Sequence, residues 1–221
     1  MTTKQPIIFC DFDGTITNSD NIIAIMKEFA PPEWDGIKNQ VLAQEVSIKE
    51  GVGKMFALLP SSKKQDIKNF IMKHAEIREG FAEFVSYAKE KNIPLYVVSG
   101  GIDFFVEPIL ASYISSEDIY CNSSDFSQNQ ISIVWPHTCD NSCENDCGCC
   151  KPTIIRSLCK ENDRIIVIGD SITDLEAARL ADQVIARDFL ADKCKNLGIP
   201  FSSFETFFDV MEILKKSEVR A

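Results

Sequence analysis

Residues 7–15 read Ile-Ile-Phe-Cys-Asp-Phe-Asp-Gly-Thr, and this stretch decides the fold. The four apolar residues 7–10 form a short run that predicts a buried strand of a parallel sheet. Asp11 and Asp13 follow at once, and Gly14 lets the backbone approach a bound phosphate closely. Two carboxylates this close repel each other unless a cation lies between them or one takes up a proton. The stretch therefore predicts a buried strand that ends in an acidic, metal-binding turn.

Two further polar segments also directly follow short apolar runs. Ser99-Gly100-Gly101 follows the run 95–98, and Gly-Asp-Ser-Ile-Thr-Asp at 169–174 follows the run 165–168. Reactive groups gather at the carboxyl ends of strands in open α/β sheets, so these segments are expected to meet the first one. Lys151 is predicted to open a helix instead.

The residue types in these segments suit phosphoryl transfer. Asp170 adds a carboxylate for Mg²⁺, which prefers a few carboxylates, water and a phosphate oxygen, and Asp174 lies one helical turn further on. Ser99 and the amides of the two glycines after it are expected just before a helix, where unpaired N–H groups favour anions. Lys151 supplies positive charge for a developing oxyanion. Each piece alone is usually a cap, a turn or a surface charge, but the four in this order predict one site.

The alternation of strands and helices predicts an α/β fold with a parallel sheet and helices on both faces. Residues 20–76 interrupt it, because their apolar residues recur at helical spacing without a strand pattern, which predicts an insert of about four helices. After residue 79 the expected elements are a helix at 80–91, a strand at 94–99, a helix at 103–113, a strand at 118–122, a β-hairpin at 125–135, a helix from 152, a strand at 165–168, a helix at 173–181, a strand at 184–186 and a helix at 204–216.

Composition limits the function classes. The 221 residues suit one main domain with an insertion, and the apolar runs are too short to span a bilayer. The first residues show no apolar signal-peptide region, so a cytoplasmic location and no membrane partner are expected. The net charge of -10, without a Lys/Arg-rich stripe, disfavours nucleic acid as a partner. A small-molecule phosphate ester remains the expected partner, and the sequence carries no signal for the oligomeric state.

Five of the nine cysteines fall within residues 139–150. Such a cluster in a cytosolic chain indicates metal binding before disulfides. It offers enough thiols for a structural, four-coordinate Zn²⁺ site. Reduced packing thiols and labile disulfides are the alternatives. The candidate ligands are Cys139, Cys143, Cys147, Cys149 and Cys150.

The pattern Asp11-x-Asp13-Gly14-Thr15, Ser99, Lys151 and Gly169-Asp170-x-x-x-Asp174 resembles the haloacid dehalogenase superfamily of phosphatases over the whole chain. The resemblance implies a Rossmann-like core of residues 1–16 and 78–221 with a helical cap of residues 17–77.

The same resemblance implies a role for each motif residue. Asp11 is the nucleophile that forms an aspartyl-phosphate, and Asp13 is the general acid and then the base. The phosphate-binding residues would be Asp11, Gly14, Ser99, Gly100 and Lys151. Mg²⁺ would be held by Asp11, the backbone carbonyl of Asp13 and Asp170, with Thr15 and Asp174 supporting them.

Five stretches resemble a narrower group, the bacterial 2-hydroxy-3-keto-5-methylthiopentenyl-1-phosphate phosphatases of methionine salvage. They are residues 30–34, 47–53, 77–81, 135–137 and 147–152. The cysteine-rich stretch is the most specific, because it lies directly before the motif lysine. The resemblance implies 1,2-dihydroxy-3-keto-5-methylthiopentene as the product.

Two other functions remain open from the sequence. Phosphoserine phosphatases share this core and cap type, and Asp20 stands where they carry a cap carboxylate. Met55 aligns with their cap arginine, and it suits either an apolar substrate tail or the core of the cap. Other small phosphomonoesters belong to the same alternative. The second is a catalytically silent relative that binds metal or a partner through the cysteine loop, but the intact motif residues favour an enzyme.

Overall fold

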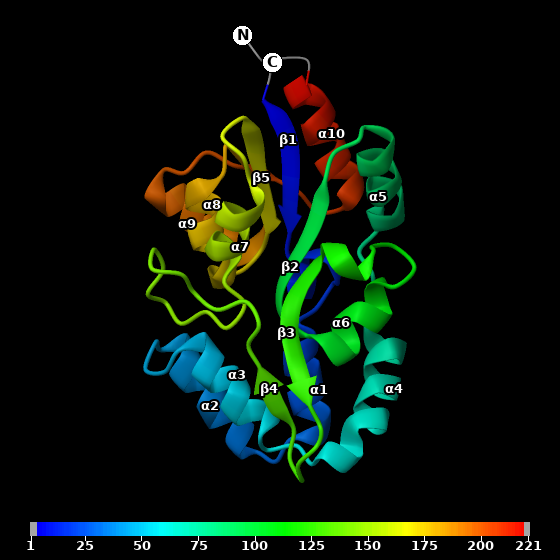
Figure 1. Ribbon diagram of the computed structural model, residues 1–221, viewed down its shortest axis with the longest axis vertical. Coiled ribbons are helices and arrows are strands. Elements are labelled where there is room, and N and C mark those ends of the chain that lie inside the picture. The colour runs from blue at the N-terminus through cyan, green and yellow to red at the C-terminus, as the bar shows by residue number, and fades with distance from the viewer. Residues whose placement is uncertain (1–3, 219–221) are drawn as a thin grey trace.

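The structure is a computed structural model and describes residues 4–218. A seven-stranded sheet with the order β4-β3-β2-β1-β5-β6-β7 forms its centre (Figure 1), and every pairing is parallel except that of β3 with β4. The strands are β1 Gln5–Cys10, β2 Leu95–Ile102, β3 Ile119–Asp125, β4 Ser132–Val134, β5 Asp163–Gly169, β6 Gln183–Ala186 and β7 Ser202–Ser203. The helices are α1 Asn21–Phe29, α2 Glu33–Leu42, α3 Ile48–Phe56, α4 Lys64–His74, α5 Phe81–Glu90, α6 Asp103–Leu110, α7 Lys151–Leu158, α8 Leu175–Leu180, α9 Asp188–Leu197 and α10 Phe207–Glu218.

Strand β1 is buried on both faces, as its apolar run predicts. Ile8 and Cys10 point into a large core shared with α5, α6 and α10, whereas Ile7 and Phe9 point into a second core shared with α7 and α8. Side chains alternate between the faces of a strand, so a continuous apolar run suits a strand covered on both sides. The predicted α/β fold with helices on both faces is confirmed.

The insert between β1 and α5 contains the four helices α1 to α4. Figure 1 shows them beyond the carboxyl ends of β1 and β2. The two connections to the core pair with each other: Thr17 forms a bridge with Ile77, and the N–H of Arg78 donates to the carbonyl of Ile16 at 2.8 Å. The insert is therefore joined to the core through two connecting segments that lie side by side.

The insert also contacts the β3–β4 hairpin. The N–H of Ile131 donates to the carbonyl of Leu59 at 3.0 Å, and the N–H of Ser61 donates to the carbonyl of Asn129 at 2.9 Å. The ring of Phe56 in α3 packs edge-on against Phe104 in α6.

No described helix is long and apolar enough to cross a membrane.

Several element boundaries differ from the expectations. Strand β2 continues to Ile102 through an irregularity in its pairing with β3, so the glycines of Ser99-Gly100-Gly101 belong to the strand. Helix α6 ends at Leu110, and a 3₁₀ turn precedes the short α8. Helix α9 and strand β7 were not predicted. Of the residues of α9 only Leu190 and Cys194 are buried, and β7 has two residues.

Candidate active site

The polar segments meet at the carboxyl edge of three neighbouring strands. Asp11 follows β1, Ser99 lies in the last half of β2, and Asp170 follows β5, with β1 between the other two. Lys151 opens α7, where Cys150 precedes it as the N-cap residue. The expected convergence of the segments is therefore observed in the geometry.

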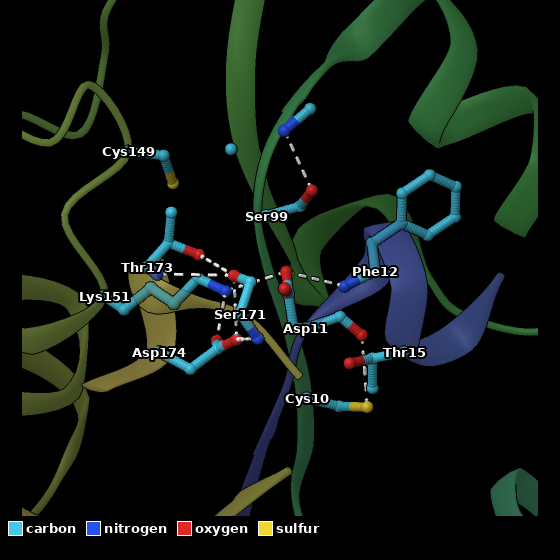
Figure 2. Close-up of polar contacts among 12 residues, drawn as sticks. Cys10, Asp11, Phe12, Thr15, Ser99, Cys149, Lys151, Ser171, Thr173 and Asp174 are labelled. Carbon is cyan, nitrogen blue, oxygen red and sulfur yellow. Dashed lines mark hydrogen bonds and ion pairs between the residues drawn. The ribbon is translucent and has the colours of Figure 1, made fainter. Parts of the chain in front are cut away.

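Lys151 bridges two buried carboxylates (Figure 2). Its Nζ lies 2.7 Å from Oδ1 of Asp11 and 2.5 Å from Oδ1 of Asp174. Burial disfavours the charged ammonium group, but the two carboxylates outweigh it and raise the pKa of Lys151. Oδ2 of Asp174 accepts hydrogen bonds from the N–H groups of Asp170 and Ser171. Both carboxylate oxygens of Asp174 therefore accept hydrogen bonds, one from Lys151 and the other from the turn after β5. Lys151 is therefore a fixed positive charge beside Asp11.

Asp11 uses only one of its carboxylate oxygens for contacts with the protein. Oδ1 accepts from Lys151 and from the N–H of Phe12 at 2.8 Å. No group in the described part of the chain donates to Oδ2. Burial and the nearby Asp174 raise the pKa of Asp11 well above its usual value, against the opposing effect of Lys151. The second oxygen is therefore available to a ligand.

Asp170 lies against the turn that follows Asp11. Its Oδ1 accepts from the Thr15 hydroxyl at 2.6 Å. Gly14 has a left-handed backbone, with φ of 77°, and a Cβ there would lie 2.3 Å from Oδ2 of Asp170. Only glycine fits this close approach. Burial and Asp174 raise the pKa of Asp170 to about 6.

The donor set on this edge fits a divalent cation. Carboxylate oxygens of Asp11, Asp170 and Asp174 lie within 4.8 Å of one another. Lys151 offers a single positive charge to these three groups, and hard cations prefer such oxygen ligands. Because both oxygens of Asp174 already accept hydrogen bonds, Asp11 and Asp170 are the better placed ligands.

Asp13 is held from one side and open on the other. Its Oδ1 accepts from the backbone N–H of Asn21 at 2.9 Å and from Nδ2 of Asn21 at 2.7 Å. Its Oδ2 faces Gly101, where a Cβ would lie 3.0 Å away. Burial and the charge of Asp20 raise the pKa of Asp13 to about 7. The carboxyl group can therefore hold a proton near neutral pH.

Ser99 is buried, and one of the two amides that follow it already has a partner. The N–H of Gly101 donates to Oγ of Ser99 at 2.9 Å, so this amide already has a partner. The segment lies in the irregular end of β2 and, as expected, directly precedes a helix, since α6 begins at Asp103. The phosphate-binding role of Ser99 and Gly100 stays a prediction. Within the described residues the Ser99 hydroxyl is an acceptor for Gly101, and a hydroxyl can also donate one hydrogen bond.

Three residues that matter for the geometry were missed from the sequence. Arg78 is 8% exposed and donates to the carbonyls of Gly14 and Thr15, both at 2.7 Å. Asn21 holds Asp13, and Asn122 donates to the carbonyl of Gly100 at 2.8 Å. The partners of Arg78 and Asn122 lie far away in sequence, and no local pattern signals these contacts. Asn21 follows the helix-capping Asp20, which offered a weak signal.

The two predicted cap residues occupy different environments. Asp20 is exposed, and its carboxylate caps α1 by accepting the N–H of Ile23 at 3.0 Å. Met55 is 4% exposed and belongs to the large apolar core. Their role toward a substrate stays a prediction.

The cysteine loop brings four of its five thiols together. The Sγ atoms of Cys139, Cys143, Cys147 and Cys150 lie within 4.8 Å of one another. Cys149 does not join them, because its thiol points toward the carbonyl of Tyr120 at 3.6 Å and its side chain packs in the second core. Counting thiols could not show this, since neighbouring residues point in different directions.

Comparisons with known proteins agree with this geometry. The family model described as haloacid dehalogenase-like hydrolase matches residues 8–179. Among solved structures, a substrate-bound phosphoserine phosphatase complex superposes with a TM-score of 0.70 at 18% identity, covering 96% of this chain and 99% of the other. A phosphoserine phosphohydrolase-like protein from Francisella tularensis gives 0.69 at 18% identity, with 95% and 99% coverage. At these identities the likeness shows the fold.

Curated relatives are much closer in sequence. A 2-hydroxy-3-keto-5-methylthiopentenyl-1-phosphate phosphatase from Geobacillus thermodenitrificans is 58% identical over 99% of both chains. A protein of the same name from Bacillus pumilus is 57% identical over 94% of this chain and 90% of its own. The resemblance noted in the motifs is thereby confirmed, and the chain belongs to the haloacid dehalogenase-like hydrolases.

Proposed function

We propose that the chain is a Mg²⁺-dependent phosphatase that converts 2-hydroxy-3-keto-5-methylthiopentenyl-1-phosphate to 1,2-dihydroxy-3-keto-5-methylthiopentene in methionine salvage. The observation that carries the proposal is the constellation of Asp11, Asp13 and Lys151 at one sheet edge. Full-length relatives at 52–58% identity, most of which carry that phosphatase name, support the choice of substrate.

In the first step Oδ2 of Asp11 attacks the phosphorus, and the bond from phosphorus to the enol oxygen breaks. Lys151 and the N–H of Phe12 hold Oδ1, which orients the attacking oxygen. Asp13, protonated near neutral pH, gives its proton to the leaving oxygen from Oδ2. The products of this step are the enol and a phosphoryl group on Asp11.

In the second step water attacks the phosphorus of the aspartyl-phosphate. Asp13, now ionised, takes a proton from that water, and Asp11 leaves as a carboxylate. Lys151 and the hydroxyl of Ser99 bind the phosphoryl oxygens in both steps, where fixed charges and donors are most effective. Asp11, Asp170 and the carbonyl of Asp13 would hold Mg²⁺, which offsets negative charge on the transferred group when bound.

The proposal divides the chain into a core of residues 1–16 and 78–221 and a cap of residues 17–77. The paired connections at Thr17 and Ile77 support this division, as does the position of α1–α4 beyond the carboxyl edge. A cap in this place excludes water from the aspartyl-phosphate when it closes.

The lack of an arginine in the cap supports an apolar substrate tail over phosphoserine. Residues 17–77 contain no arginine. The first arginine of the chain, Arg78, is occupied by backbone carbonyls. The carboxylate of phosphoserine would lose its water without gaining an arginine partner. An enolate is also a better leaving group than the serine alkoxide, so it demands less of Asp13.

Phosphate release from purified protein tests the proposal. The methylthiopentenyl ester should be preferred over phosphoserine by about a hundredfold or more in kcat/KM, as expected from a few kcal/mol of unpaired charge. Equal efficiency on both esters would replace the methionine-salvage assignment with the phosphoserine one. Met55→Arg is a weaker test, because Met55 is 4% exposed and the new charge would enter the core.

A single variant tests the covalent step. Asp11→Asn should abolish turnover with an unchanged circular dichroism spectrum, because an amide cannot form the acyl phosphate. Near-native activity of Asp11→Asn would show that Asp11 is not the nucleophile.

A further inference from the structure

We propose that the loop before α7 is a structural zinc site whose four ligands are the thiolates of Cys139, Cys143, Cys147 and Cys150. It lies outside the reaction described above and does not depend on it. Cys149, although it lies between two ligands in sequence, is not part of the site.

The positions of the sulfur atoms fit tetrahedral coordination. A Zn–S bond is about 2.3 Å long, so two thiolates on one tetrahedral zinc ion lie about 3.8 Å apart. The Sγ atoms of Cys143 and Cys147 are 3.8 Å apart, and all four Sγ atoms lie within 4.8 Å of one another. The cysteines are recorded as free thiols, so no disulfide among them competes with this arrangement in the described residues.

Hydrogen bonds to the sulfur atoms fit thiolates. The N–H of Cys147 donates to Sγ of Cys139 at 3.4 Å, and the Thr153 hydroxyl donates to Sγ of Cys150 at 3.1 Å. Partners of this kind orient metal-bound ligands and offset their negative charge.

The loop is also anchored at both ends, which preforms the site. Asp140, next to Cys139, accepts two hydrogen bonds from Arg156 of α7 at 2.6 and 2.8 Å. Its N–H donates to the Thr153 hydroxyl at 3.0 Å. The N–H of Cys150 donates to the carbonyl of His137 at 2.8 Å. The first and last ligands are thus tied to each other through the start of α7.

The geometry excludes the two other candidate ligands nearby. Cys149 points away, toward the carbonyl of Tyr120. The ring of His137 packs against the ring of Tyr120, with centroids 5.2 Å apart, and is not among the converging groups.

Two parts of the molecule depend on the shape of this loop. Lys151 directly follows the ligand Cys150, so a metal that fixes Cys150 also fixes the start of α7. On the other side, Asp146 lies between two ligands and accepts from the Ser47 hydroxyl at 2.7 Å, while Lys49 of α3 pairs with it at 3.2 Å. The loop of residues 139–150 therefore connects Lys151, the proposed phosphate-binding lysine, with α3 of the insert.

Metal analysis of tag-free protein, purified with reducing agent and without chelator, tests the proposal. Wild type should contain about one zinc per chain. Cys143→Ser should lose most of it, whereas the matched control Cys149→Ser should keep it. Cobalt substitution should give the visible ligand-field bands of a tetrahedral tetrathiolate in wild type and Cys149→Ser, but not in Cys143→Ser. Hydrogen exchange at the start of α7 and of α3 should become faster in Cys143→Ser.

Each contrary outcome overturns a defined part of the proposal. Zinc-free wild type with all nine thiols reactive, a disulfide within the loop, or iron in place of zinc would each reject the zinc site. Loss of zinc from Cys149→Ser as complete as from Cys143→Ser would reject the ligand set. None of these measurements uses substrate, so failure of the phosphatase proposal is distinguishable from failure of this one.

Discussion

Arg78 is the residue whose removal should reveal most about how the site is held. Its guanidinium group donates to four backbone carbonyls: Gly14 and Thr15 at 2.7 Å, and Thr17 and Glu205 at 3.3 Å. Burial lowers the pKa of Arg78, but an arginine stays charged at any physiological pH. Three of these carbonyls, those of Gly14, Thr15 and Thr17, belong to the turn that carries Asp13.

The magnitude follows from these contacts. A hydrogen bond from a charged donor contributes about 1.5–3 kcal/mol, and the two short bonds dominate. Arg78→Met keeps the apolar part of the side chain and leaves the carbonyls without a donor. We expect a loss of about 3–5 kcal/mol in the free energy of unfolding. For a chain of this size that corresponds to a fall in Tm of about 6–20 °C.

Urea unfolding followed by circular dichroism measures the effect. The control is Arg179→Met, which removes an exposed arginine that pairs with Glu176 at 3.2 Å and should change stability by about 0.5 kcal/mol or less. Arg78→Lys should lie between wild type and Arg78→Met, since one ammonium group cannot reach all of the carbonyls. If Arg78→Met is within about 1 kcal/mol of wild type, the carbonyl contacts do not hold the turn and the reasoning is refuted.

Three further predictions concern the same edge of the sheet. Asn21→Leu should lower kcat about tenfold to a hundredfold with little change in KM, because the hydrogen bond from Nδ2 of Asn21 to Asp13 is lost. An unchanged kcat would contradict this positioning role of Asn21. Gly14→Ala should destabilise the protein by about 1–2 kcal/mol through its left-handed backbone alone, and the close approach to Asp170 should add to this loss. The control Gly36→Ala lies in α2 with open space around it and should stabilise the protein slightly. Equal shifts of the urea midpoint in the two variants would argue against the close approach. Desalting into Mg²⁺-free buffer without chelator should abolish turnover, and added Mg²⁺ should restore it, because weakly bound Mg²⁺ is lost while thiolate-bound zinc stays. Full activity after desalting and exhaustive dialysis would contradict a Mg²⁺ requirement.

The framework of the site could be predicted because its signals are local. Apolar runs before residues 11, 99 and 170 mark buried parallel strands, and the topology of such sheets brings their carboxyl ends together. The strand order β2-β1-β5 is what makes the three segments neighbours. Lys151 was placed correctly because a helix start is also marked locally.

Contacts that join distant parts of the chain could not be predicted in the same way. Arg78 gave no sign that it binds the carbonyls of residues 14–17, since backbone carbonyls carry no sequence signature. The continuation of β2 to Ile102 depends on its pairing with β3, which lies about 20 residues further along the chain. Cys149 was grouped with the other thiols because a count of cysteines says nothing about direction.

The beginning of the insert is bonded to Asp13, and this couples the insert to the proposed chemistry. At its beginning, Asn21 in the first turn of α1 donates two hydrogen bonds to Asp13. Directly after the insert, Arg78 of the core donates to the carbonyls of Gly14 and Thr15 and holds the turn that follows Asp13. A movement of the insert about its two connections must therefore either carry the Asp13 carboxyl with it or break the two hydrogen bonds from Asn21. Such bonds are among the stronger ones in proteins, so the carboxyl is expected to follow the insert. Asp13, the proposed proton donor, would then reach its working position only when the insert covers the site.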